Sequence, residues 1–472
     1  MKKGHVSIKE KLGFSIGEFS SSIVWQTLMF FLPIFYTDTF GLTASAVALM
    51  FGVVRIFDAF TDPVMGIIAD RTETRWGKFR PFILWLAIPY GLGTVLMFTT
   101  PDLVGQAKIV YAYVTYSAMM IIYTAIMIPY NSLIGVISPN PDERTSVSSY
   151  KFVFAYAAGF SVQLLIIPLV NRLGAGDDAK GYQLTMAIFA VISVIFFIIS
   201  FLSVKERVKP DTDQVNNIKN DLKDLLNNRP WIILFFISLA TLIYVAIRSA
   251  DIAYFFKYYI KYEAVIETIK ATGGDNLWTN IHAAMYNMGT FMAVGTVFVL
   301  LGVLPTKKIS ARIGKRKLYI WCMFIITVSS TAFYFAGPED IVLIYIAQII
   351  FSLASGPTMP LLWSMLADTA DYSQWKNGRR ATGLVYSAAT FAQKAGFGLG
   401  GVIVMGILSW FGFVANMDQS NFSILGIRLS MSVVPAAVAL IGAILLFFYK
   451  LDDKTVKQIE DDLEKRRELK NA

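Results

Sequence analysis

The chain has 472 residues, of which 55% are hydrophobic and only 16% are charged. Soluble proteins carry charge on about a quarter of their residues, so this composition excludes an ordinary soluble domain and predicts an all-α integral membrane protein. The net charge of +9 comes from basic residues placed between hydrophobic segments, which a membrane explains better than nucleic-acid binding does.

Hydrophobic segments long enough to cross a bilayer, about 20 residues each, recur along the whole chain. Those of the first half cover 13–37, 43–69, 81–100, 107–137, 148–171 and 182–204. Those of the second half cover 230–260, 281–304, 317–336, 340–366, 380–412 and 424–449. The sequence therefore predicts twelve transmembrane helices.

The second segment carries the most informative polar residues. Asp58 and Asp62 lie four residues apart, so they share one helix face, and Arg55 precedes Asp58 on that face. Two carboxylates inside a membrane are unfavourable unless they bind a cation, a proton or an arginine. Their oxygens, with the hydroxyl of Thr61, suit a hard cation such as Na⁺. A cation site, a proton site and a purely structural Arg–Asp network all stay open here.

A charged loop follows this helix, with Gly77 available for a tight turn. We predict that it pairs with acids on neighbouring helix ends and closes a cytoplasmic gate, although it can also serve as a topology anchor alone. Candidate partners are Asp142, Glu143, Asp368 and Asp371. The predicted gate residues are Asp70, Arg71, Arg75, Lys78, Arg80, Arg144, Asp368, Asp371, Arg379 and Arg380.

The division of the chain follows from its longest polar stretch and from an internal repeat. Residues 205–229 predict a cytoplasmic linker between an N-terminal half, 1–204, and a C-terminal half, 230–450, followed by a cytoplasmic tail, 451–472. The linker and the tail have amphipathic spacing, which indicates a solvated structural helix or one lying on the membrane or on the helix bundle. Arg75–Arg80 and Arg312–Lys317 are similar loops half a chain apart, which predicts two related six-helix halves.

The distribution of lysine and arginine predicts the orientation. Most of them lie on one side of the predicted membrane, among which we count Arg144 and Lys151. The opposite loops hold few: Lys108, Arg172, Lys180, Lys257, Lys261 and Lys270. Because basic loops stay in the cytoplasm, both termini are predicted to be cytoplasmic, in a multi-pass protein of the cell inner membrane.

Six motifs in this order resemble the glycoside–pentoside–hexuronide:cation symporters of the major facilitator superfamily. They are RIFDAFTDPVMG, ADRTETRWGKFRPF, IPYNSL, ERTSVSSY, MLADTADY and FAQKAGFGLGG, and they extend over nearly the whole chain. The resemblance implies the fold of that superfamily and import of a sugar with Na⁺ or H⁺. It places the cation on Asp58 and Asp62, assisted by Thr61 and Thr124, and puts Lys394 near both ligands.

The sugar site departs from that of the galactoside carriers in this family. Acids of their first and fourth helices are replaced by Ser22 and Met127, a tryptophan is replaced by Asn131, and a basic residue of the fifth helix is replaced by Phe152, next to Lys151. A less negative cavity would admit a uronide or a xyloside. Predicted substrate residues are Glu18, Ser22, Trp25, Asn131, Arg248, Thr390 and Lys394. Trp25, Tyr123, Tyr130, Trp363 and Tyr386 either stack on the sugar or pack between helices.

The predicted function is secondary active symport of a sugar, glycoside, pentoside or hexuronide by alternating access. An exporter or a uniporter of another small solute, within the same superfamily, is the nearest alternative. No HExxH, GxSxG, CxxC or P-loop pattern occurs, so we expect no enzyme activity. We expect no cofactor beyond the coupling cation, no other metal and no nucleic-acid partner. The lipid bilayer and the sugar are the expected partners of a functional monomer.

Overall fold

The structure is a computed structural model that describes residues 5–138, 141–207, 227–273, 277–377 and 382–471. It consists of helices, with no β-strand among these residues, and forms two compact units. Unit 1 comprises residues 1–213 with 414–416, and unit 2 comprises 214–413 with 417–472. The predicted all-helical membrane fold is confirmed. The exact linker limits stay a prediction, because most of 205–229 lies outside the described residues.

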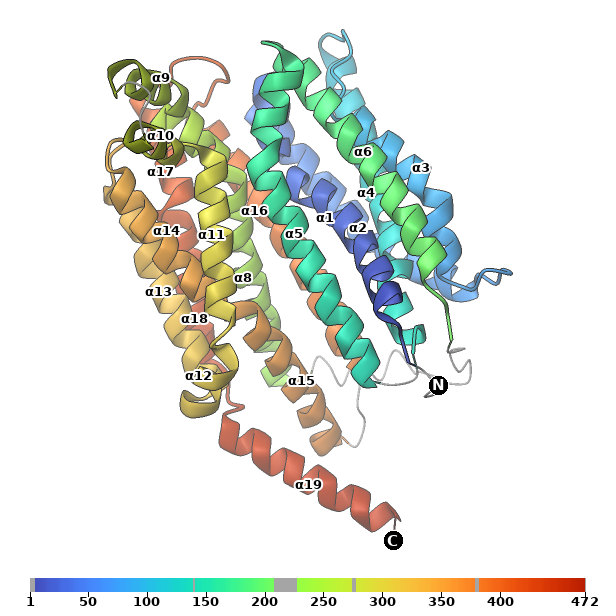
Figure 1. Cartoon of the computed structure of the whole chain (residues 1–472). Coiled ribbons are helices and arrows are strands. Elements are labelled where there is room, and N and C mark those ends of the chain that lie inside the picture. The colour runs from blue at the N-terminus through green and yellow to red at the C-terminus, as the bar shows by residue number, and fades with distance from the viewer. Residues whose placement is uncertain (1–4, 139–140, 208–226, 274–276, 378–381, 472) are drawn as a thin grey trace. The chain divides into compact units, whose positions relative to one another are not determined.

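Unit 1 contains six long helices that run side by side (Figure 1). They are α1 (Ile8–Ile34, continued by the π-helical turn η1, Phe35–Thr39), α2 (Ala44–Arg71), α3 (Arg80–Met97), α4 (Gln106–Val136), α5 (Pro141–Gly174) and α6 (Asp178–Ser203). Side-chain caps fix where several begin: Ser7, Thr43 and Asp177 accept the backbone N–H three residues later. α1 packs against α5 and α6, and α2 packs against α4.

Unit 2 also consists of helices, but more of them are short and follow one another after an interruption. Its helices are α8 (Arg229–Tyr254, continued by η2, Phe255–Ile260), α9 (Tyr262–Gly273), α10 (Leu277–Met285), α11 (Met288–Val303), α12 (Thr306–Ile313), α13 (Lys315–Phe335), α14 (Ile341–Ser355), α15 (Thr358–Asn377), α16 (Thr382–Trp410), α17 (Asn421–Met431), α18 (Val433–Phe448) and α19 (Asp453–Asn471). α8 packs against α16 and α18. Unit 2 therefore has α8 at the centre of its helix packing.

Ten described helices or helix pairs are long and apolar enough to cross a membrane, and the bent pair α10–α11, with an 80° break, is an eleventh. α2 is the remaining predicted span. Its 28 residues reach about 42 Å, and among its described side chains Ala44–Val54 forms an apolar stretch shorter than a full span. Arg55, Asp58 and Asp62 interrupt the rest, and these are the residues for which we predict a function.

The repeated loops share one backbone feature. Gly77 and Gly314 both adopt a positive φ, +112° and +93°, which a residue with a Cβ rarely tolerates. The following helices, α3 and α13, begin within three residues of these glycines. The repeat found in the sequence therefore corresponds to the same turn in both units.

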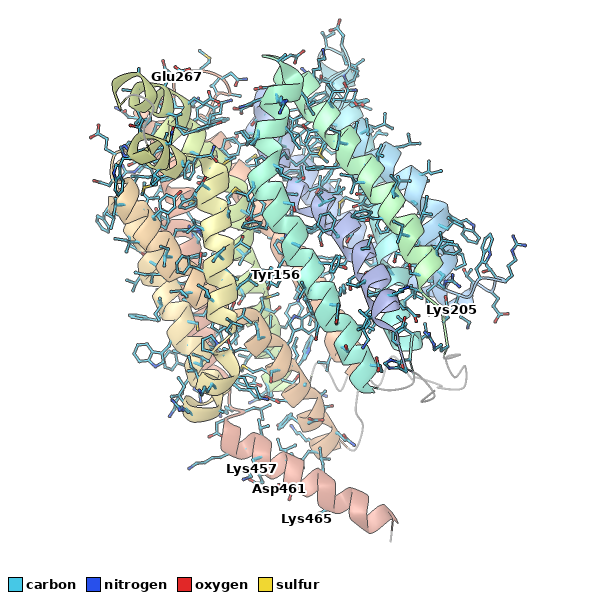
Figure 2. The ribbon with its side chains drawn as sticks, viewed as in Figure 1. Tyr156, Lys205, Glu267, Lys457, Asp461 and Lys465 are labelled. Carbon is cyan, nitrogen blue, oxygen red and sulfur yellow. The ribbon has the colours of Figure 1, made fainter. Side chains whose placement is uncertain are left out.

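The tail forms the helix α19, which is amphipathic. Ile459 and Leu463 belong to the buried core of unit 2, and the indole N–H of Trp375 in α15 donates to Asp462 at 3.0 Å. Figure 2 shows Lys457, Asp461 and Lys465 at successive turns of the same helix, and all three side chains are exposed. The tail thus lies on the helix bundle of unit 2 and keeps one solvated face, which was one of the predicted alternatives.

Small residues allow the central helices to approach closely. A Cβ added to Gly400 of α16 would collide with the side chain of Ala246 in α8, whereas one added to Gly406 of the same helix would meet nothing within 4 Å. Gly400→Ala should therefore lower the free energy of unfolding by about 1–3 kcal/mol, and Gly406→Ala should leave it unchanged or raise it. Thermal unfolding in detergent measures both, and equal midpoints would contradict the close packing.

Candidate functional site

The predicted cation site is partly assembled in unit 1. Thr124 of α4 is 2% exposed, and its hydroxyl donates to Asp62 Oδ1 of α2 at 3.0 Å. Thr61 is half-buried beside Asp62. Asp58 lies one turn earlier in α2, but its side chain lies outside the described residues. The structure thus brings together two of the four residues predicted to hold the cation, from two different helices.

These oxygen atoms suit an alkali cation better than a transition metal. Carboxylate and hydroxyl oxygens are hard ligands. Among the described side chains, no group of three or more His, Cys, Asp or Glu residues gathers to hold a metal ion. The site therefore depends on Asp62 and on hydroxyl groups, together with whatever the Asp58 carboxylate contributes.

A second polar cluster joins three helices of unit 1. Lys151 of α5 lies 3.4 Å from Glu18 Oε2 of α1 and donates to Asn131 Oδ1 of α4 at 2.6 Å. Ser22, one turn after Glu18, donates to Glu18 Oε1 at 3.4 Å. Two predicted substrate residues, Glu18 and Asn131, thus contact one lysine, and a third, Ser22, contacts Glu18. We call these four residues the Glu18–Lys151 cluster.

Lys151 lies near the start of α5, in the helical run Ser146–Gly174 that contains an apolar window long enough to span a membrane. Its place on the cytoplasmic side of that membrane stays a prediction. Phe152, which replaces the basic residue of the galactoside carriers, is 56% exposed. A one-residue shift along α5 therefore moves the positive charge onto Lys151.

The aromatic residues divide into two groups. Trp25 stacks on Tyr123 with ring centroids 4.9 Å apart, and both are only partly buried, so they offer a ring surface beside Ser22. Tyr130 is fully buried, donates to the carbonyl of Phe14 at 2.6 Å and stacks on the Phe14 ring. Tyr130 is therefore a packing residue. Trp363 packs against the core of unit 2, and the side chain of Tyr386 lies outside the described residues.

The predicted substrate residues of unit 2 are less closely grouped. Arg248 of α8 is 5% exposed, and it donates to Gln348 of α14 and to the carbonyl of Met431. Lys394 is partly buried in α16. The side chain of Thr390 lies outside the described residues. The roles of these three residues stay predictions.

The predicted gate loop of unit 1 is held by an acid that the sequence did not single out. The carboxylate of Glu206, just after α6, accepts backbone N–H groups of Lys78, Phe79 and Arg80 at 2.9, 2.8 and 3.0 Å. It therefore satisfies the unpaired N–H groups at the start of α3, where a negative charge is favourable. Arg80 also donates to the carbonyls of Trp76 and Phe201. Arg71 and Arg75 are exposed.

The acids proposed as partners of this loop have other contacts. Glu143 binds Lys11 and His5, both at 2.8 Å, and hydrogen bonds from Lys11 and then His5 lower the pKa of Glu143 to about 2. Asp368 binds Lys315, at the start of α13 in its own unit, at 2.8 Å. Asp371 is partly buried one turn further along α15. Arg379 and Arg380, and the side chains of Asp70, Asp142 and Arg144, lie outside the described residues.

Comparison with known proteins identifies the family. A family model for MFS/sugar transport proteins matches residues 13–273 and 277–453. The chain belongs to this family. It is 33% identical to the putative glycoside/cation symporter YagG of Escherichia coli, over 98% of this chain and 96% of that protein. It is 34% identical to the isoprimeverose transporter of Lactiplantibacillus pentosus, over 100% and 94%. The resemblance to the glycoside–pentoside–hexuronide:cation symporters is thereby confirmed.

The fold agrees with that of solved sugar transporters. The D-xylose–proton symporter superposes with a TM-score of 0.60 at 14% identity, over 95% of this chain and 98% of that one. At such identity the likeness shows the fold alone. The chain is thus a multi-pass MFS transporter of the sugar-transport family.

Sequence reasoning missed two functional candidates of this sugar transporter for different reasons. Lys151 directly precedes Phe152, the position at which the galactoside carriers have a basic residue. Neighbouring residues point to different faces of a helix, and this difference was the signal that could have distinguished Lys151 from Phe152. Glu206 binds backbone N–H groups, which every residue possesses, so no residue pattern reveals its partners. An acid three to five residues after a spanning helix is too common to identify such a cap.

Glu206→Gln should loosen the gate loop. Hydrogen bonds to a charged acceptor contribute about 1.5–3 kcal/mol, so amide exchange at Lys78, Phe79 and Arg80 should accelerate roughly tenfold or more. Hydrogen–deuterium exchange of the purified protein measures it. Glu73→Gln, at an exposed acid of the same loop, is the matched control and should change nothing. Equal exchange in both variants would show that Glu206 does not hold the loop.

Proposed function

We propose that the chain is a cation-coupled symporter that imports a sugar or glycoside by alternating access. The observation that carries this proposal is the Thr124–Asp62 hydrogen bond, because it joins two helices at the acid that the family motif marks as a cation ligand. A cation on Asp58, Asp62, Thr61 and Thr124 would favour the sugar-binding state. Such coupling requires that each ligand raise the affinity of the other by the same factor.

We propose Na⁺ or H⁺ as the coupling ion, with both termini in the cytoplasm of a functional monomer in the inner membrane. An oxygen-only site suits Na⁺, whereas a carboxyl group in an apolar helix also suits a proton.

Net export or uniport of another solute is the alternative function. Uptake into membrane vesicles, with sodium and proton gradients imposed separately, distinguishes these functions: accumulation against the sugar gradient supports symport, and mere equilibration would overturn it.

The sugar is proposed to bind at the Glu18–Lys151 cluster with Trp25 under its ring. Glu18 largely neutralises Lys151 at 3.4 Å, so the cluster presents hydrogen-bonding groups with little net charge. This arrangement favours a neutral glycoside, and the similarity to an isoprimeverose transporter agrees with it. A uronide would have to displace Glu18 from Lys151. The uptake of a labelled substrate, measured with unlabelled isoprimeverose or with an unlabelled glucuronide as competitor, decides between neutral glycosides and uronides.

Asp62→Cys should abolish cation-stimulated uptake while the protein still inserts into the membrane, and Asp58→Cys should do the same. Thr124→Val should be milder, since it removes one hydroxyl: the half-saturating cation concentration should rise about fivefold to tenfold, equivalent to about 1 kcal/mol. Thr115→Val in the same helix is the control, because its hydroxyl donates to the carbonyls of Tyr111 and Ala112 in α4 and also interacts with the Tyr36 side chain, away from Asp62. Normal stimulation in both cysteine variants would refute the cation site.

Lys151→Met should weaken sugar binding. It removes a charged donor from the cluster and leaves Glu18 without its ion-pair partner, so the KM for sugar should rise roughly tenfold or more. Phe152→Leu, at the exposed neighbouring position, should leave KM unchanged. Initial rates of uptake at saturating cation measure both. If Phe152→Leu raised the KM for sugar and Lys151→Met did not, the sugar would bind elsewhere.

A further inference from the structure

Asp251 is a buried acid that neither the family motifs nor the proposed cation site uses. It lies near the end of α8, in unit 2, and is 0% exposed. Within the described part of the chain, neither of its carboxylate oxygens accepts a hydrogen bond. Buried polar groups are nearly always paired, and an unpaired carboxylate in an apolar interior is among the least favourable of them. Asp251 therefore requires a ligand or a change of charge.

Arg248 is the nearest charged group, one turn earlier on the same face of α8. Its guanidinium is directed elsewhere. Nη2 donates to Gln348 Oε1 at 2.6 Å, and the group lies 4.4 Å and 4.0 Å from the ring centroids of Phe333 and Phe351. Among the described residues its donors go to Gln348 and to the carbonyl of Met431, and neither oxygen of Asp251 accepts from it. Arg248 thus influences the Asp251 carboxyl from a distance and leaves its oxygens unsatisfied.

The other elements packed against α8 bring no closer partner. In α16, Gly396 and Gly400 lie against Leu242 and Ala246. Lys394 therefore sits roughly 16 Å from Asp251 along the helix axis. α18 contains no titratable residue. α15 meets the start of α8, where Asn228 donates to the carbonyl of Thr369, so its Asp368 and Asp371 lie at the opposite end of α8.

The remaining cations near this end of α8 are occupied by aromatic rings. Arg428 of α17 lies over Tyr259 and Tyr334, at 5.3 and 4.9 Å from the ring centroids. Lys257 of η2 lies 5.3 Å from the centroid of Tyr258. α14 adds Tyr345, whose hydroxyl is buried. No described cation therefore neutralises Asp251 by direct contact.

We propose that Asp251 is a proton-binding site of unit 2, protonated in the state described here. A neutral carboxyl group tolerates burial far better than a carboxylate does. A metal cation would need several oxygen ligands, whereas Asp251 offers two, next to the positive charge of Arg248. The ligand chemistry that fits is therefore a single proton. The site goes beyond the proposed sugar and cation sites, and its test does not depend on either.

Arg248 supplies the means of releasing this proton. When its guanidinium exchanges Gln348 for Asp251, the carboxylic acid loses its proton to water as a carboxylate forms. The new ion pair then compensates the buried negative charge. When Arg248 returns to Gln348, the carboxylate takes a proton back from water. One arginine with two alternative acceptors thus forms a two-state element of the kind that conformational switching requires.

Infrared pH-difference spectroscopy on the full-length protein tests the proposal without transport. A protonated carboxyl group in apolar surroundings gives a C=O stretching band that a carboxylate lacks. We expect this band at neutral pH in the wild type, its complete loss in Asp251→Asn, and its persistence in the double variant Asp58→Asn/Asp62→Asn. Asp340→Asn, at an exposed acid of unit 2, is the matched control and should keep the band.

Three results would overturn the proposal. The first is a wild-type spectrum without a protonated carboxyl band at neutral pH, which requires no variant to fold. The second is an unchanged band in Asp251→Asn. Gln348→Leu leaves Asp251 intact and removes the competing acceptor of Arg248, so the band should weaken as the guanidinium turns to Asp251. Loss of the band in the Asp58/Asp62 double variant instead would assign the proton to the cation site of unit 1.

Discussion

Inside a bilayer a charged side chain must find its counterpart within the protein, because hydrocarbon offers neither water nor ions. This constraint explains most of the specific contacts in both units. In unit 1, Glu18 and Asp62 are each met by a group from another helix, Lys151 and Thr124. In unit 2, Arg248 is met by Gln348 and two aromatic rings. The polar contacts between helices are therefore also the places where ligand binding can alter the packing.

The two units meet the same constraint at their repeated loops with different chemistry. Both loops turn at a glycine with positive φ, Gly77 and Gly314. In unit 1 the carboxylate of Glu206 binds backbone N–H groups, whereas in unit 2 Asp368 binds the ammonium group of Lys315. A backbone cap fixes the loop geometry, while a lysine pair can break and reform without disturbing a helix. The repeated fold thus holds its two loops by different contacts.

Helices and their order were predictable, because each span needs about 20 apolar residues, and the motif string located Asp62 and Thr124 correctly as neighbours. Contacts that depend on side-chain direction were not. Lys151 was counted only among the basic residues of the cytoplasmic side, because its contacts with Glu18 and Asn131 depend on helical phase and not on composition. Asp251 was overlooked because an isolated acid in a helix resembles a cap or a boundary. Only the packing of α8 shows that no described donor reaches it.

A transporter that couples two ligands needs sites whose charge changes as the ligands come and go. The Glu18–Lys151 cluster is nearly neutral without a ligand, so a sugar can exchange hydrogen bonds there at small electrostatic cost. At the proposed cation site Asp62 would offer a carboxyl group to the coupling ion, whereas the buried Asp251 is tolerated best while it is neutral or paired. The two proposed sites are therefore not equivalent, because one would bind a coupling ion and the other a single proton. Such asymmetry allows cation binding and protonation to favour different conformations of one carrier.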